Sequence, residues 1–233
     1  MHNSVLSSGQ RAVLGGLLLV SFVAALDATV VSTALYRIGE SLHGLTAQAW
    51  VTTAFLITST VTTPVYGRLA DQFGRTRLYV VAVVVFLAGS VLCSLATSMT
   101  ALAVFRAVAG IGGGGVFSLT SAIIGVLAPP SERARYSSYF IAVFATASVL
   151  GPLVGGVLAG ADSLLGVAGW RWIFLVNLPI GAIALAVVVR APWVGGRTAV
   201  RRVDHLGALL LVVALVPLLL VAQWGQQWGW GAG

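Results

Sequence analysis

Long apolar segments recur along the whole of this sequence, with short polar joints between them. A helix rises about 1.5 Å per residue, so roughly 20 apolar residues cross the hydrocarbon core of a bilayer, which is about 30 Å thick. Only 8% of the residues are charged, against about 25% in soluble domains. The pattern predicts an all-α polytopic membrane protein with spans at about residues 12–35, 49–67, 78–97, 100–127, 137–160, 171–190 and 205–222.

The arginines predict how these spans are oriented. With the N-terminus in the cytoplasm, ten arginines fall on the inner side and two on the outer side, and Arg106 lies within the fourth span. Cytoplasmic joints of membrane proteins carry such an excess of basic residues. The predicted organisation is a cytoplasmic N-terminus (1–11), a six-span domain (12–190), a cytoplasmic loop (191–204), and a seventh span with an outer tail rich in tryptophan and glycine (205–233).

The composition excludes several classes of activity. All 13 basic residues are arginine, so there is no lysine for a phosphate-binding loop, a kinase site or a Schiff base. The histidines His2, His43 and His205 are far apart, and the single cysteine, Cys93, lies in an apolar run. We therefore predict no metal site, no cofactor and no enzyme. The net charge of +7 fits the orientation of the spans better than it fits a nucleic-acid partner.

Two charged residues lie inside the predicted spans, where a charge is costly and usually functional. Asp27 is about eight residues from the outer end of the first span, and Arg106 is about six residues from the outer end of the fourth. At about 1.5 Å per residue, both lie roughly 10 Å below the outer boundary. Their matched depth and opposite signs predict that they form a pair.

This pair has two interpretations. Burial favours the neutral form of a carboxyl group, whereas a nearby guanidinium favours the carboxylate. If helix movement changes the separation of Asp27 and Arg106, the proton affinity of Asp27 changes with conformation, as proton coupling requires. The alternative is a structural ion pair that only fixes the register of the helices.

A third group of charges lies in the joint at residues 68–77. Starting at Gly67 the sequence reads Gly-Arg-Leu-Ala-Asp-Gln-Phe-Gly-Arg-Thr-Arg, with two glycines that permit a tight turn. Ordinary cytoplasmic charge explains arginines in such a joint, but the placement of an aspartate among them is more specific. The candidate residues here are Gly67, Arg68, Asp71, Gly74, Arg75 and Arg77.

Small residues mark the fourth and fifth spans. Ala147, Gly151, Gly155 and Ala159 recur every four residues, which lets another helix approach closely, and Pro152 permits a kink. These features suit a helix that bends during transport, and plain packing without motion fits them equally. The glycines of the fourth span also match a dinucleotide-binding pattern, but they lie inside an apolar span and do not follow a strand, so that interpretation is rejected.

Five segments together resemble the major facilitator superfamily, and within it the fourteen-span drug:proton antiporters. The charged joint resembles the family's cytoplasmic signature, and residues 26–35 resemble its first-helix motif, with Asp27 at the acidic position. The other matches are the fourth-helix motif (Arg106, Gly110, Gly112), the fifth-helix antiporter motif (Gly151, Pro152, Gly155, Gly156) and the sixth-helix signature (Trp170, Arg171, Asn177, Pro179, Gly181). The resemblance implies proton coupling through Asp27 and Arg106 and a cytoplasmic latch that includes Asp71 and Arg75.

The resemblance also implies a fold, an activity and partners. The first six spans correspond to one domain of two inverted three-helix repeats, and the seventh resembles the first of two linking helices. We expect a proton-driven exporter of a small cationic or lipophilic molecule, in a bacterial inner membrane and without a cofactor. A second six-helix domain is absent from the 233 residues, so the expected partner is a C-terminal half. The alternatives are a truncated membrane protein that does not transport and one subunit of a split transporter.

Overall fold

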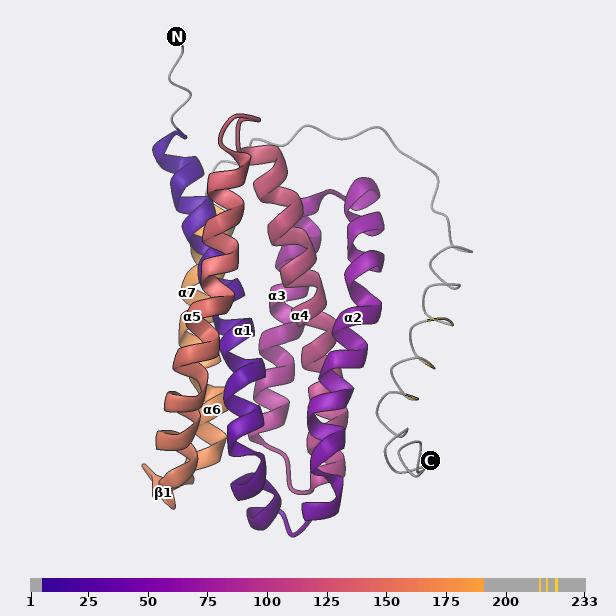
Figure 1. Cartoon of the computed structure of the whole chain (residues 1–233), viewed down its shortest axis with the longest axis vertical. Coiled ribbons are helices and arrows are strands. Elements are labelled where there is room, and N and C mark those ends of the chain that lie inside the picture. The colour runs from indigo at the N-terminus through magenta and orange to yellow at the C-terminus, as the bar shows by residue number, and fades with distance from the viewer. Residues whose placement is uncertain (1–5, 191–213, 215–216, 218–220, 222–233) are drawn as a thin grey trace, which may run out of the picture.

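The computed structural model describes residues 6–190 and the isolated positions 214, 217 and 221. Its long helices run side by side and alternate in direction (Figure 1). They are α1 (Ser8–Ser41), α2 (Gln48–Phe73), α3 (Arg75–Ser94), α4 (Met99–Leu127), α5 (Arg133–Gly160), and a broken sixth made of α6 (Trp172–Leu175) and α7 (Asn177–Arg190). The predicted loop 191–204 and the seventh span with its tail, 205–233, lie outside the described residues apart from the three isolated positions.

Five helical segments in the described part of the chain are long and apolar enough to cross a membrane: α1, α3, α4, α5 and the segment Gly169–Arg190. The second predicted span, α2, is long enough but is less apolar because serine and threonine recur along it. Several of these hydroxyl groups are used in packing on α4. The Thr62 hydroxyl donates to the carbonyl oxygen of Ile111 at 3.4 Å, and the Thr63 hydroxyl donates to the carbonyl oxygen of Gly114 at 3.3 Å.

Helix α1 is longer than the predicted span 12–35 at both ends. It starts in a capping box, in which Ser7 and Gln10 exchange side-chain and backbone hydrogen bonds. It continues to Ser41 through an exposed turn in which Arg37 and Glu40 approach to 3.7 Å. The prediction that residues 36–48 form a joint is therefore wrong for its first half, because polar residues beyond the apolar run can continue a helix in water. Only residues 42–44 and the short 3-10 turn η1 (Leu45–Ala47) separate α1 from α2.

The joint between α2 and α3 is much shorter than the predicted range 68–77. Helix α2 ends at Phe73 and α3 begins at Arg75, so Gly74 alone makes the turn. Its φ of +89° is the left-handed region that glycine adopts without strain. The sequence suggested a turn with two glycines, but Gly67 lies inside α2, where its position faces Ser118 of α4. The charged residues of this segment thus lie on two rigid helix ends rather than on a loop.

The glycines of α4 allow it to pack closely on both α2 and α3. A Cβ at Gly110 would overlap the backbone of Phe55 and the hydroxyl of Thr58 on α2, and a Cβ at Gly114 would overlap Ser59 and Thr62 of the same helix. A Cβ at Gly112 would instead overlap the backbone of α3 at Ala82 and Phe86. One run of glycines therefore contacts two neighbouring helices. Gly110 and Gly114, four residues apart, face α2, and Gly112 faces α3.

The small-residue face of α5 packs against α1, as Figure 1 shows. A Cβ at Gly151 would overlap the Thr29 side chain, and one at Gly155 would overlap the Thr33 hydroxyl. Thr29 also donates across the interface to the carbonyl oxygen of Ala147 at 3.0 Å. The predicted close approach of another helix to this face is confirmed. Pro152 and Gly156 are both on the exposed side of α5, and no atom lies within 4 Å of the position that a Cβ at Gly156 would occupy.

The segment between α5 and α7 contains the few strand residues of the described chain. Strands β1 (Ser163–Leu164) and β2 (Val167–Ala168) pair as an antiparallel hairpin, with positive φ at both Leu165 and Gly166. Positive φ at both central residues is the rule for a two-residue hairpin turn. After the 3-10 turn η2 (Gly169–Arg171), the predicted sixth span is interrupted at Val176. Pro179 has no N–H to donate to the carbonyl oxygen of residue 175, which accounts for the break.

Candidate functional site

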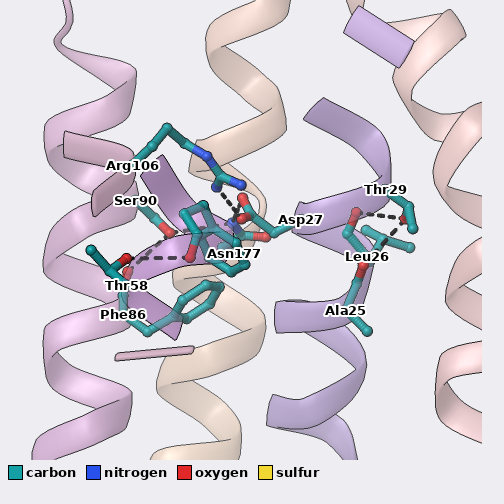
Figure 2. Close-up of polar contacts among 10 residues, drawn as sticks. Ala25, Leu26, Asp27, Thr29, Thr58, Phe86, Ser90, Arg106 and Asn177 are labelled. Atoms are coloured by element: carbon teal, nitrogen blue, oxygen red, sulfur yellow. Dashed lines mark hydrogen bonds and ion pairs between the residues drawn. The ribbon is translucent and has the colours of Figure 1, made fainter. Parts of the chain in front are cut away.

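A buried ion pair lies at the centre of the helix bundle. Asp27 of α1 is 1% exposed, and Arg106 of α4 is also 1% exposed. The Arg106 guanidinium donates through Nη1 to Oδ2 of Asp27 (Figure 2). The structure thus brings together the two charges that the sequence places at similar depth. A single unpaired charge would be far more costly in this environment than the pair is.

The second oxygen of Asp27 contacts a residue from the sixth span. Asn177 begins α7 and is also 1% exposed; its Nδ2 donates to Oδ1 of Asp27 at 2.9 Å. The same Nδ2 lies 3.3 Å from the hydroxyl of Ser90 on α3, and Ser90 donates in turn to the carbonyl oxygen of Phe86. Figure 2 shows these side chains gathered around Asp27. Residues from α1, α4 and α7 therefore meet at one carboxylate, and α3 joins them through the contact of Ser90 with Asn177.

The Arg106 guanidinium also lies over an aromatic ring. Its Cζ is 4.2 Å from the centroid of Phe55 on α2, within range of a cation–π interaction. Its Nε is buried and has no hydrogen-bond partner in the described chain. The plane of the Arg106 guanidinium therefore contacts α2, and its N–H edge contacts α1. Its Nε–H makes no hydrogen bond in the described chain.

Sequence reasoning named Asn177 as part of a motif but did not predict its contact with Asp27. It missed Ser90 and Phe55 altogether. Ser90 could have been noticed as a polar residue within an apolar span, whereas nothing in the sequence distinguishes Phe55 from other apolar side chains. Among the described residues, no group of three or more His, Cys, Asp or Glu side chains is placed to hold a metal ion.

The charged residues of the α2–α3 turn lie at the end of the bundle where α1 begins (Figure 1). Asp71 of α2 and Arg75 of α3 approach to 3.6 Å across Gly74, and both side chains are partly exposed. Arg77 is exposed, and Arg68 is half-buried. This cluster lies at the end of the bundle where α1 begins, whereas Asp27 lies near the middle of α1. The two sites share no residue.

The remaining sixth-span residues fix the opposite end of the bundle. The Trp170 indole donates to the Ser41 hydroxyl at 3.1 Å, which ties η2 to the end of α1. Arg171 stacks over the Trp170 ring and donates to the carbonyl oxygens of Ser94, the last residue of α3, and of Ala96 just beyond it. Cations near the last carbonyls of a helix are favourable. Gly181 of α7 lies against Leu87 of α3, whereas Pro179 is exposed. These residues hold α7, and with it Asn177, in place.

Comparison with known proteins identifies the family. The family model described as Major Facilitator Superfamily matches residues 17–228. The chain is 39% identical over 216 residues to "Multidrug transporter protein MdtP" of Bacillus subtilis (strain 168), a match that covers 92% of this chain and 39% of that protein. It is 37% identical to "Multidrug resistance protein 3" of the same organism, over 91% of this chain and 40% of that protein. The chain thus spans about two fifths of the length of these relatives.

Solved structures agree on the fold. A proton:xylose symporter, XylE, bound to 6-bromo-6-deoxy-D-glucose superposes with a TM-score of 0.71 at 17% identity, covering 94% of this chain and 52% of that one. A bacterial homologue of the human lysosomal transporter Spinster, in an inward-facing and unoccupied conformation, gives a TM-score of 0.69 at 23% identity, covering 86% and 47%. This chain therefore belongs to the Major Facilitator Superfamily, and its described helices form a six-span domain of that transporter fold in a multi-pass membrane protein.

Proposed function

We propose that this chain is part of a proton-coupled exporter of small molecules, in which Asp27 takes up and releases the coupling proton. The observation that carries the proposal is the ion pair of Asp27 and Arg106, which is buried inside the helix bundle. Ionisable residues within membrane spans are rare because they are costly, and they commonly mark proton or substrate pathways. The relatives named for multidrug transport and for multidrug resistance support a small-molecule exporter.

The ion pair supplies a physical route to coupling. A conformation that holds Arg106 against Asp27 favours the carboxylate, and one that separates them in a buried site favours the protonated acid. The two conformations therefore differ in proton affinity, and protonation shifts the population between them. The proton gradient then supplies the free energy, so the proposal requires no cofactor.

The proposed substrate is a small lipophilic or cationic molecule. The names of the two relatives point to multiple small molecules rather than to one nutrient. A buried carboxylate is also a natural partner for a positive charge, which would compete with the proton for the same site. We further propose that the N-terminus faces the cytoplasm, because the arginines of the α2–α3 turn lie at that end of the bundle.

The test is proton-driven efflux of a cationic dye from right-side-out vesicles that contain the intact gene product. We expect Asp27→Asn to reduce the efflux rate at least ten-fold, a loss of about 1.4 kcal/mol or more, because an amide cannot exchange the coupling proton. The matched control is Asp162→Asn, which makes the same chemical change at an exposed aspartate after α5 and should leave efflux unchanged. Undiminished proton-driven efflux by Asp27→Asn would overturn the proposal.

The pair of Asp71 and Arg75 is proposed to act as a latch between α2 and α3 rather than as a stabilising ion pair. Because both side chains are partly exposed, Asp71→Asn should change the free energy of unfolding by less than about 1 kcal/mol. The same variant should still slow dye efflux, since the latch affects the balance between conformations. One purified preparation would be divided between two measurements. Its unfolding in mixed micelles and its efflux from reconstituted vesicles would separate the two effects. A variant that transports at the wild-type rate would contradict the latch.

A further inference from the structure

Both oxygens of the Asp27 carboxylate face hydrogen-bond donors. Oδ2 accepts from the Arg106 guanidinium, and Oδ1 accepts from Nδ2 of Asn177 at 2.9 Å. An ionised carboxylate is only an acceptor, so this arrangement satisfies it. A protonated carboxyl group carries an O–H that needs an acceptor, and neither contact supplies one. Protonation of Asp27 therefore requires at least one of its two partners to change.

Only the nitrogen of the Asn177 side-chain amide makes hydrogen bonds in the described chain. Its Nδ2 carries two hydrogens, and one faces Oδ1 of Asp27 while the other faces the Ser90 hydroxyl at 3.3 Å. Its Oδ1 is buried and accepts no hydrogen bond from the described part of the chain. A buried acceptor without a donor costs about 1–3 kcal/mol. The amide thus keeps an acceptor next to the one carboxyl group that would gain a donor on protonation.

We propose that Asn177 is the positioning residue that accepts a hydrogen bond from the protonated carboxyl group of Asp27, while the proton stays on Asp27. When Asp27 is protonated on Oδ2, its bond from Arg106 breaks and its O–H donates to Oδ1 of Asn177. Nδ2 of Asn177 continues to donate to Oδ1 of Asp27, so the acid and the amide form a two-point pair. Every polar atom of the amide then has a partner. This inference rests on the proposed function, because it needs Asp27 to be the group that binds the proton.

The groups around Asp27 allow this exchange. The charged and titratable groups that interact with it in the described chain are Arg106 from α4 and Cys93 from α3. Asn177 of α7 and Ser90 of α3 are polar but carry no charge, and α2 contributes the Phe55 ring, over which the guanidinium lies. Loss of the carboxylate charge would thus loosen Arg106 while Asn177 tightens on Asp27. Protonation would therefore weaken the contact of α1 with α4 and strengthen its contact with α7.

The sequence makes the test direct, because it has four aspartates (Asp27, Asp71, Asp162 and Asp204) and two asparagines (Asn3 and Asn177). The full chain with Asn3→Ser, labelled with ¹³C at the Cγ of aspartate and asparagine, would be titrated in lipid bilayers by solid-state NMR. We expect the Asp27 signal to titrate and the Asn177 Cγ signal to move downfield with the same midpoint, as a carbonyl does when it gains a donor. Ser90→Ala should preserve this shared midpoint, because the Asp27 contact remains.

The outcomes separate this inference from the proposed function. If the Asp27 signal titrates but the Asn177 Cγ signal stays in place, Asn177 does not accept a hydrogen bond from the protonated Asp27 and the inference is overturned. If Asp27 never titrates across the accessible pH range, the proposed function itself fails. In Asp27→Asn, which adds one further amide signal, no amide Cγ signal should change with pH. A pH-dependent Asn177 signal in that variant would also overturn the inference.

Discussion

Replacing Arg106 with glutamine is expected to destabilise the folded chain by about 3–5 kcal/mol, the cost of removing one partner from a buried ion pair. The glutamine would leave the Asp27 carboxylate buried without its charged donor, and the cation–π contact with Phe55 would also be lost. The free energy of unfolding in mixed micelles measures this effect. A loss below about 1 kcal/mol, the range of exposed ion pairs, would mean that the pair is solvated and not buried as described.

A double-mutant cycle shows how much of that loss belongs to the unpaired charge. Asp27→Asn combined with Arg106→Gln replaces both charges with amides of similar shape. We expect the double variant to be markedly more stable than the sum of the two single losses predicts, because neither charge is left alone. Strictly additive losses would show that the two side chains do not interact in the folded state.

Gly112→Ala is expected to cost about 3 kcal/mol, at the upper end of the range for overpacking. The new Cβ would lie 2.6 Å from the carbonyl oxygen of Ala82 and 2.6 Å from Cα of Phe86, and closer still to the backbone nitrogen of Phe86. These are backbone atoms of α3, so no side-chain rotation can relieve the overlap and the two helices must separate. Thermal unfolding of the purified variant in detergent would measure the loss.

The matched control lies on the same helix. Gly125 of α4 has no atom within 4 Å of the position its Cβ would occupy. Gly125→Ala should therefore be neutral or stabilising by up to about 1 kcal/mol, since alanine favours a helix over glycine. Equal destabilisation by the two substitutions would show that the loss at Gly112 does not come from its contact with α3. Equal neutrality would contradict the close packing of α3 and α4.

The helices and the central ion pair could be predicted because each depends on local or one-dimensional information. An apolar run of sufficient length predicts a span wherever it occurs, since only helices and closed barrels satisfy the backbone in lipid. Asp27 and Arg106 could be matched because depth follows from counting residues inward from the same boundary. The ends of α1 and α2 could not be predicted this way, because charged residues such as Arg37 and Arg68 are compatible with either a loop or a helix in water.

The partners of the site depended on how the helices rotate and cross. Asn177 lies 150 residues from Asp27 in sequence, and its contact exists only because α7 packs against both α1 and α3. The same holds for the glycines of α4, whose pattern showed close approach but not that Gly110 faces α2 while Gly112 faces α3.

By itself the sequence determined that the chain spans a membrane, the order of its spans, and the two opposite charges, Asp27 and Arg106, that are expected to pair within them. Hydrophobicity and charge are properties of residue types, so they can be read without coordinates. Only the tertiary structure decided which atoms meet: the guanidinium on Oδ2 of Asp27, the Asn177 amide on its Oδ1, and the amide oxygen that remains unused. Such contacts depend on the direction of each side chain about its helix axis, and that direction is set by the packing of all the helices together.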